Sequence, residues 1–308
     1  MISSYSGGLS PIALFVYNRP WHTQQTVEAL QKNELAKESD LFIFSDAPKR
    51  AETSEAVQRV REYIKTLEGF RSVQVILRPE NLGLAQSIIA GTTDLVNQFG
   101  RVIVIEDDLI TSPYFLAYMN DALERYADDE RVISIHAYVY PTVRKLPELF
   151  FLRGADCLGW ATWKRGWRLF NPDGKNLLSE LQRRRLTKIF DFDDTYPYIK
   201  MLEDQILGKN DSWAIRWYAS AFLADKLTLY PGRSLIRHIG NDNSGTNFGA
   251  SNRLDTVLSD SPVVLSQLNV EDSKQARRAF EAYFRKNYTG LSGRVIRKIR
   301  SIATKGTS

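Results

Sequence analysis

The chain has 308 residues, of which 43% are hydrophobic and 25% are charged, an ordinary balance for a globular protein that can bury a sizeable core. Because Cys157 is the only cysteine, the sequence excludes an intramolecular disulfide framework and a cysteine-based zinc site. No stretch approaches the roughly 20 consecutive apolar residues that a membrane-spanning helix needs. Residues 1–10 lack the pattern of a secretory signal, so we expect a cytoplasmic protein.

The net charge of +5 is unevenly distributed, because residues 271–308 carry +7 and the residues before them carry −2. Four apolar residues of this tail recur at helical spacing beside basic residues: Leu291, Val295, Ile299 and Ile302. That pattern is typical of a helix lying on an anionic membrane, which we expect here. A helix packed on the domain or exposed to solvent is the alternative. Nucleic-acid binding is not expected, because no recognition motif accompanies the charge.

Apolar runs of strand length alternate with helical patterns in the first part of the chain. The runs are Pro11–Tyr17, Leu41–Phe44, Val73–Leu77 and Val102–Ile105. The helical patterns between them are Trp21–Leu35, Glu55–Leu67 and Ala85–Phe99. This alternation predicts a parallel sheet with right-handed crossover connections.

The rest of the chain is less regular. Helices are predicted over Tyr114–Tyr126, Asn210–Leu223 and Val270–Tyr288, and strands over Val132–His136, Leu149–Leu152, Leu227–Tyr230 and Ser234–Ile239. Trp163 and Trp167 are four residues apart, a spacing that predicts one helical face and a place in the core.

The run Val102–Ile105 ends abruptly in three carboxylates, those of Glu106, Asp107 and Asp108. Four consecutive β-branched residues predict a strand buried on both faces, whereas burial of three adjacent acids would be costly. Ligands of open α/β sheets bind at the carboxyl ends of the strands, and carboxylates with diphosphate oxygens suit Mg²⁺ or Mn²⁺. The sequence therefore predicts a metal and ligand site here, with an acidic, solvated turn as the alternative.

The other predicted strands also end in polar residues. Asn18 and Arg19 follow the first strand, Asp46 follows the second, and Arg78 and Asn81 follow the third. Aspartate can accept from a uracil N–H or a ribose hydroxyl, and arginine can hold a phosphate bidentately. All five residues are therefore candidates for nucleotide-sugar binding, although loops contain polar residues in any case. The glycine-rich motifs of a dinucleotide-binding Rossmann domain and of a P-loop are absent from the sequence.

These motifs, taken together and in order, resemble those of GT-A-fold glycosyltransferases, most nearly N-acetylglucosaminyltransferase I and its bacterial relatives. They are Asn18-Arg19-Pro20, Ser45-Asp46, Asn81-Leu82-Gly83, and Glu106-Asp107-Asp108-Leu109 followed by Ser112-Pro113-Tyr114-Phe115. The resemblance, over about Pro11–Gly249, implies an α/β GT-A-like domain with a mixed, mostly parallel sheet flanked by helices. We expect this domain over 1–265, with a nucleotide-sugar-binding half (9–110), an acceptor-binding half (111–265) and a basic helical tail (266–308).

The resemblance also implies roles for individual acids. It assigns Asp108 to a Mn²⁺ (or Mg²⁺) ion that bridges the nucleotide diphosphate, and Glu106 and Asp107 to the donor sugar and ribose. Arg19 and Asp46 are assigned to the nucleotide.

Trp160 stands in Leu158-Gly159-Trp160, which resembles a family segment near donor sugar and acceptor. An aromatic ring can pack against the C–H face of a pyranose, so Trp160 is a candidate for donor binding, with a place in the core as the alternative.

An inverting transferase needs a carboxylate that takes the proton of the acceptor hydroxyl. Asp211 matches the position of the base in the family's Trp-Asp-Asp-Trp segment, although Asn210 and Ser212 depart from that pattern. Asp211 also suits the cap of the following helix, and Asp204 is the second candidate for the base.

His238 precedes a Gly-, Asn- and Ser-rich stretch, Gly240–Gly249, whose composition predicts a mobile loop over bound donor. Many GT-A enzymes complete their metal site with a C-terminal histidine, although N-acetylglucosaminyltransferase I does not. His238 is therefore a candidate metal ligand, with a structural role as the alternative. His22 and His136 are expected to pack or to lie at the surface.

The expected reaction is a metal-dependent, inverting transfer of a hexosyl or N-acetylhexosaminyl group from a nucleotide-diphosphate donor. Among such donors we expect a UDP-sugar. The acceptor is a saccharide or a lipid-linked saccharide, in bacterial cell-surface polysaccharide synthesis at the inner face of the cytoplasmic membrane. One alternative is a non-catalytic saccharide- or membrane-binding protein with a degenerate transferase fold. Another is a sugar-phosphate nucleotidyltransferase, although the Gly-rich, basic loop usual after its first strand is absent.

Overall fold

The computed structural model describes residues 8–240, 242 and 254–288. Its main sheet contains β1 (Ile12–Val16), β2 (Asp40–Ser45), β3 (Ser72–Leu77), β4 (Arg101–Glu106), β6 (Val132–His136), β7 (Leu149–Arg153), β8 (Trp160–Trp163) and β9 (Leu227–Pro231). The strand order is β3-β2-β1-β4-β8-β6-β9-β7. A small second sheet pairs β5 (Leu109–Thr111) with β10 (Ile236–His238).

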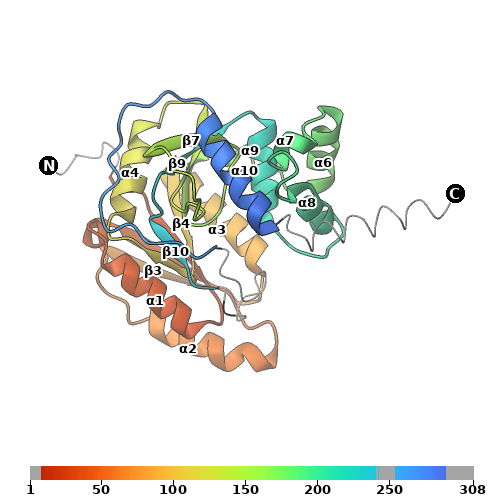
Figure 1. The fold of residues 1–308 in the computed structure, drawn as a ribbon. Coiled ribbons are helices and arrows are strands. Elements are labelled where there is room, and N and C mark those ends of the chain that lie inside the picture. The colour runs from red at the N-terminus through yellow and green to blue at the C-terminus, as the bar shows by residue number, and fades with distance from the viewer. Residues whose placement is uncertain (1–7, 241, 243–253, 289–308) are drawn as a thin grey trace.

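Helices flank the sheet (Figure 1). They are α1 (Pro20–Gln31), α2 (Ser54–Ile64), α3 (Leu84–Phe99), α4 (Phe115–Arg125), α5 (Lys164–Trp167), α6 (Gly174–Arg183), α7 (Thr187–Phe190), α8 (Tyr198–Ile206), α9 (Trp213–Leu223) and α10 (Lys274–Tyr288), with short 3-10 helices η1 (Ala36–Glu38) and η2 (Ala51–Thr53). No helix among the described residues is both long enough and apolar enough to cross a membrane.

The predicted mixed α/β fold with a mostly parallel sheet is confirmed. β1, β2, β3 and β4 pair in parallel, as the alternating pattern predicts. β8 is antiparallel to its neighbours β4 and β6, β9 is parallel to β6, and β7 closes the sheet antiparallel to β9. The carboxyl ends of β1, β2, β3, β4, β6 and β9 therefore share one edge of the sheet.

Both faces of the sheet are buried because successive side chains of a strand point to opposite faces. In β1, Ile12 and Leu14 belong to one apolar core, and Ala13 and Phe15 belong to the other. Side chains of α1, α2, α4 and α10 complete the first core, those of α3 and α5 complete the second, and α9 contributes to both.

Trp163 and Trp167 are buried, as predicted, but the expectation of one helical face was wrong. Trp163 is the last residue of strand β8 and packs in the first core, whereas Trp167 lies in α5 and packs in the second. The chain changes from extended to helical between them, so the four-residue spacing does not bring the two side chains together.

The first part of the expected basic tail packs on the domain. Phe280 and Phe284 of α10 lie in the first core, with ring centroids 5.1 and 4.9 Å from that of Tyr140. The apolar stripe Leu291, Val295, Ile299 and Ile302 and most of the expected loop Gly240–Gly249 lie outside the described residues.

Candidate active site

At the acidic end of β4, Arg19 pairs with two of the three carboxylates. Arg19 lies at the start of α1, where Pro20 occupies the first turn. Its guanidinium donates to the carboxylate of Asp107 and, over 2.9 Å, to Oδ2 of Asp108. All three side chains are largely buried. β1 and β4 are neighbours in the sheet, which is why a residue that follows β1 reaches the acids that follow β4.

His238 reaches the same acids through the small sheet. Pairing of β10 with β5 sets His238 opposite Leu109, directly after Asp108. Nε2 of His238 lies 3.3 Å from Oδ2 of Asp108, and the backbone N–H of Ile239 donates to the Asp108 carbonyl over 2.9 Å. Two candidate metal ligands that are 130 positions apart in the sequence are thus brought into contact.

The three acids have different pKa values. Burial, together with the charges of Asp108 and Asp107, raises the pKa of Glu106 to about 8. Burial also raises the pKa of Asp107, against the influence of Arg19. Burial disfavours the charged form of Asp108 as well, but the hydrogen bonds and charges of His238 and Arg19 lower its pKa to about 2. At neutral pH the cluster therefore combines an ionised Asp108 with a Glu106 that is largely protonated.

The donor atoms of this cluster fit a divalent ion that is shared with a diphosphate. Among the described residues no group of three or more His, Cys, Asp or Glu side chains is placed so that it could hold a metal ion. Magnesium-type sites, however, use only one or two protein ligands when substrate phosphates supply the others. Asp108 offers a carboxylate oxygen, which suits Mn²⁺ or Mg²⁺. Nε2 of His238 could serve as a second ligand once it gives up its hydrogen bond to Asp108. Arg19 bonds the same Oδ2 of Asp108, so it would share or yield this oxygen.

Gly240 lets the chain pass close to the acids. A Cβ atom at this position would lie 2.2 Å from Oδ2 of Asp108 and 3.1 Å from Nη1 of Arg19. A side chain here would therefore displace the carboxylate that the metal hypothesis needs.

Asp46 and Asn81 shape the loop after β3. The carboxylate of Asp46 accepts from the backbone N–H groups of Leu82 and Gly83, each over 2.9 Å. Nδ2 of Asn81 donates to the carbonyl of Ala47 over 2.7 Å. Both predicted nucleotide-binding residues therefore join the ends of β2 and β3, and a ligand contact would come in addition to this role.

Arg78 lies over the ring of Phe44, with its guanidinium carbon 5.3 Å from the ring centroid. Its Nε and Nη2 are buried and have no hydrogen-bond partner among the described residues. Buried donors without partners are rare, so this guanidinium is suited to an anionic ligand. Asn18 is half-buried at the end of β1.

Sequence reasoning missed Arg61, Thr26 and Trp21. Arg61 of α2 donates to the carbonyls of Ser45, Asp46 and Arg78 and so ties two strand ends together. The hydroxyl of Thr26 donates to the carbonyl of Asp107 over 2.9 Å. Trp21 is 57% exposed. Its position directly after Arg19-Pro20 is the sequence signal that could have marked it as a candidate for the site.

Trp160 lies in the core. Its side chain is fully buried on β8 and stacks on Trp213, with centroids 5.3 Å apart. No ring face is left for a sugar. Because Trp160 pairs with Val104 of β4, its contact with Trp213 brings the start of α9 toward the carboxyl end of β4.

Asp211 lies just before α9 with its side chain 73% exposed, and its Oδ1 is 3.5 Å from the guanidinium of Arg216. The expected cap by Asp211 was wrong, because the hydroxyl of Ser212 accepts from the Ile215 N–H and caps the helix. Asp204, the second candidate for the base, is paired with Lys200 and Lys209.

No protein-family model and no curated protein matches this chain. Similar solved structures include mannosyltransferase PcManGT from Pyrobaculum calidifontis in complex with GDP-Man and Mn²⁺, at 14% identity and a TM-score of 0.31, over 43% of this chain and 35% of that chain. S. aureus TarS matches at 12% identity and a TM-score of 0.39, over 76% of this chain and 37% of that chain.

A third is glucosyl-3-phosphoglycerate synthase from Mycobacterium tuberculosis in complex with Mn²⁺, UDP and glucosyl-3-phosphoglycerate. It is 11% identical, with a TM-score of 0.34, over 58% of this chain and 67% of that chain. The match thus spans little more than a third of the first two chains. The solved structures include glycosyltransferases, the class that the motifs resemble. Because the TM-scores are low, the case for function rests on the chain's own residues.

Proposed function

We propose that this chain is a metal-dependent, inverting glycosyltransferase that moves a sugar from a nucleotide-diphosphate donor to a saccharide or lipid-linked acceptor. One observation carries the proposal. At the shared carboxyl edge of the parallel strands, an ionised Asp108 lies in contact with both Arg19 and His238. A diphosphate needs cationic partners at this edge, and the cluster offers a guanidinium together with two ligands for a divalent ion.

Each residue of the cluster has a distinct part in this proposal. Asp108 and His238 would hold Mn²⁺ or Mg²⁺. When bound, such an ion offsets the charge that develops on the leaving diphosphate. Arg19 binds a diphosphate oxygen once the ligand competes for its guanidinium, and Asp107 accepts from the donor. Glu106, at the end of β4, would contact the donor sugar.

The polar residues at the ends of β1, β2 and β3 complete the donor site in this proposal. Arg78 supplies its unpartnered guanidinium nitrogens to the nucleotide. Asp46 and Asn81 hold the loop after β3 in place, and Asn18 follows β1, the strand next to β2. Residues 9–110 then form the donor-binding half and residues 111–265 the acceptor-binding half.

Asp211 is the proposed general base. Its carboxylate takes the proton of the acceptor hydroxyl while that oxygen bonds to the anomeric carbon and the bond to the diphosphate breaks, which inverts the configuration. Asp211→Asn should abolish most turnover and leave nucleotide binding unchanged. Near-normal turnover of this variant in a product assay would remove Asp211 from the mechanism.

The finer assignments follow the sequence resemblance. We propose a UDP-sugar donor, a hexosyl or N-acetylhexosaminyl group, and a place in bacterial cell-surface polysaccharide synthesis. The basic tail 266–308 would bring the enzyme to the inner face of the cytoplasmic membrane through its charge.

Thermal stability with nucleotides tests the proposal directly. Unfolding midpoints are measured with UDP, GDP, CDP and ADP, each with and without Mn²⁺, for wild type, Asp108→Asn and Asp94→Asn. Asp94 is an exposed residue of α3 and serves as the matched control. A ligand of the native state raises its stability by mass action, so one nucleotide should raise the midpoint only with Mn²⁺, in wild type and Asp94→Asn alone. No shift with any nucleotide would favour a non-catalytic protein instead.

A further inference from the structure

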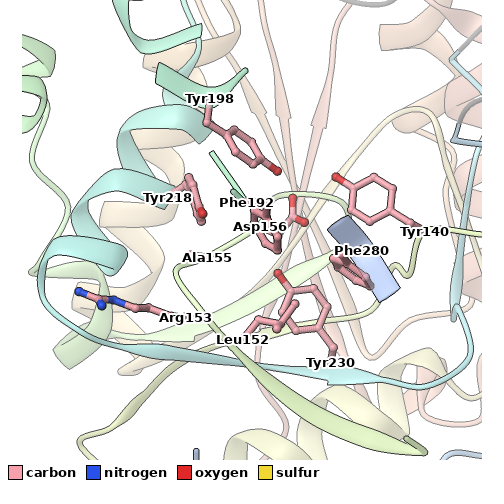
Figure 2. Close-up of a pocket in the computed structure, with 10 residues that line it drawn as sticks. All are labelled: Tyr140, Leu152, Arg153, Ala155, Asp156, Phe192, Tyr198, Tyr218, Tyr230 and Phe280. Atoms are coloured by element: carbon pink, nitrogen blue, oxygen red, sulfur yellow. The ribbon is translucent and has the colours of Figure 1, made fainter. Parts of the chain in front are cut away.

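A second carboxylate site lies on the connection between β7 and β8. Asp156 lines a pocket with Tyr140, Tyr198 and Tyr230, and Phe192 and Phe280 add further ring surface (Figure 2). These aromatic residues come from separate parts of the chain, among them α8, β9 and α10. They meet around Asp156 only in the folded protein.

Asp156 has no cationic partner among the described residues. Its Oδ1 accepts from the backbone N–H of Cys157 over 2.9 Å. Nε2 of His136 lies 4.0 Å from this oxygen, but this nitrogen accepts from the Leu158 N–H and so has no proton to donate. Arg153 also lines the pocket, and it is paired with Asp225 instead. The carboxylate is only 19% exposed, so it lacks both a counter-ion and full hydration.

Three tyrosine hydroxyls converge on this carboxylate without bonding to it. Figure 2 shows the hydroxyls of Tyr140, Tyr198 and Tyr230 pointing toward Asp156. Tyr140 and Tyr230 are 8% and 5% exposed, yet none of the three hydroxyls is hydrogen-bonded to a described residue. Tyr218 differs, because its hydroxyl donates to the Phe190 carbonyl. The three hydroxyls and the carboxylate face one small space, which a further polar group could enter.

The size of the pocket limits what can enter. Its free volume is about 10 Å³, room for one water-sized group. A hydroxyl can donate to Asp156 and at the same time accept from a tyrosine. A sugar that inserts one hydroxyl would leave its ring at the mouth of the pocket, against aromatic surface.

The connection that carries Asp156 runs past the carboxyl end of β4. Asp156 lies four residues before Trp160, which pairs with Val104 in β4. After burial, the charges of Asp156, Glu106 and Asp108 all raise the pKa of Cys157. Both carboxylate sites are therefore within electrostatic reach of this one residue.

We propose that the Asp156 pocket is the acceptor subsite, in which Asp156 accepts a hydrogen bond from a hydroxyl of a saccharide and Tyr140, Tyr198 and Tyr230 surround that hydroxyl. This proposal rests on the proposed transferase function. Asp156 binds and positions the acceptor, whereas Asp211 remains the base. The ligand class is a saccharide with a free hydroxyl on its terminal sugar.

The test measures saccharide binding without any donor. Wild type is screened on a glycan array, and the best glycan is titrated calorimetrically into Asp156→Asn, Tyr230→Phe and the controls Asp94→Asn and Tyr63→Phe, on α3 and α2. Loss of a hydrogen bond to a charged group should weaken binding about tenfold in Asp156→Asn. Tyr230→Phe should weaken it less, and the controls should bind as wild type does. Absence of any bound glycan, or equal affinity of Asp156→Asn and wild type, would overturn the proposal.

The nucleotide assay separates this inference from the proposed function. Asp156→Asn should keep the Mn²⁺-dependent nucleotide shift of wild type, which also shows that the variant is folded. An intact nucleotide shift with unchanged glycan affinity refutes the acceptor subsite alone. Glycan binding that depends on Asp156, in a wild type that binds no nucleotide, refutes the transferase and with it the acceptor role of the pocket. In a turnover assay Asp156→Asn should raise the acceptor KM with little change in kcat, and a fall in kcat alone would contradict a binding role.

Discussion

The acidic end of β4 contains a cation that pairs with its acids, whereas among the described residues no cation pairs with Asp156, and Arg153 of its pocket pairs with Asp225 instead. At the first site Arg19 bonds both Asp107 and Asp108, and His238 touches Asp108. At the second site Asp156 faces tyrosine hydroxyls and aromatic rings. The comparison shows two ways to keep a carboxylate in a partly buried place. At the first site a cation of the protein stabilises the carboxylates before any ligand binds. At the second site a carboxylate that lines a pocket depends on water or on the hydroxyl of a ligand.

Replacement of Arg19 should have the largest effect on stability. Arg19→Met leaves Asp107 and Asp108 buried without their guanidinium, and loss of one partner of a buried pair costs about 3–5 kcal/mol. Urea denaturation at neutral pH measures the loss. Arg59→Met is the matched control, since the Arg59–Glu55 pair is largely exposed and its loss should change the free energy of unfolding by no more than about 0.5 kcal/mol. Equal losses in the two variants would mean that the cluster does not need its cation.

Gly240→Ala should disturb the first site without removing a charge. The new Cβ would lie 2.2 Å from Oδ2 of Asp108, and relief of such overpacking costs about 1–3 kcal/mol. We expect a lower unfolding midpoint and a weaker Mn²⁺-dependent nucleotide shift, both measured by thermal denaturation. An unchanged nucleotide shift would mean that Asp108 is not part of the proposed metal site.

The pH dependence of stability tests the buried histidine beside the second site. Burial lowers the pKa of His136, with Asp156 opposing, and the rings of Tyr138 and Tyr230 face it. The unfolded chain then takes up the proton first as the pH falls. The neutral form of His136 therefore makes its full contribution to the free energy of unfolding above about pH 6.5, the ordinary pKa of a histidine in the unfolded chain. This contribution is lost as the pH falls from there to the lower pKa of the folded chain, by about 1.4 kcal/mol for each pH unit between the two pKa values.

Free energies of unfolding from pH 5.5 to 7.5 check this dependence. In His136→Gln the amide oxygen can still accept from the Leu158 N–H, so we expect no large loss at pH 7.5. The slope of stability against pH should be lower than that of wild type by the His136 contribution. Glu106, whose raised pKa gives a slope of the opposite sign, is present in both proteins and cancels in this difference. Equal slopes in wild type and variant would show that His136 is not the group responsible.

Asp156→Asn should have the smallest effect on stability. No cation pairs with Asp156 among the described residues, so removal of its charge should change the free energy of unfolding by less than about 1 kcal/mol. Asp107→Asn, measured by the same urea denaturation, should cost more because it breaks the contact with Arg19. A larger loss in Asp156→Asn than in Asp107→Asn would reverse the comparison between the two sites.

The donor edge of the fold could be predicted because its signals are local. Each apolar run of β1, β2, β3 and β4 is continuous in sequence, and helical patterns between the runs indicate parallel pairing. The polar residues after each run therefore had to share one edge. The contact of Arg19 with Asp107 and Asp108 follows from that topology together with the length of an arginine side chain.

The second half could not be predicted in the same way. β5 has three residues and pairs with β10, which lies more than a hundred positions later in the sequence. No local pattern therefore indicates the contact of His238 with Asp108. Trp160 was a candidate for a sugar platform, but a tryptophan in a short strand has the same local sequence whether it is exposed or buried. Ser212, and not Asp211, caps α9, although both residue types suit that position.

The sequence by itself determined the alternation of strands and helices, the parallel half of the sheet and the line of polar residues at its carboxyl edge, because these depend on the period of apolar residues along the chain. Only the tertiary structure decided which distant groups meet. His238 beside Asp108, Trp160 within the core and the three tyrosines around Asp156 result from packing between segments far apart in the chain, and such packing depends on shapes and volumes that no local pattern contains.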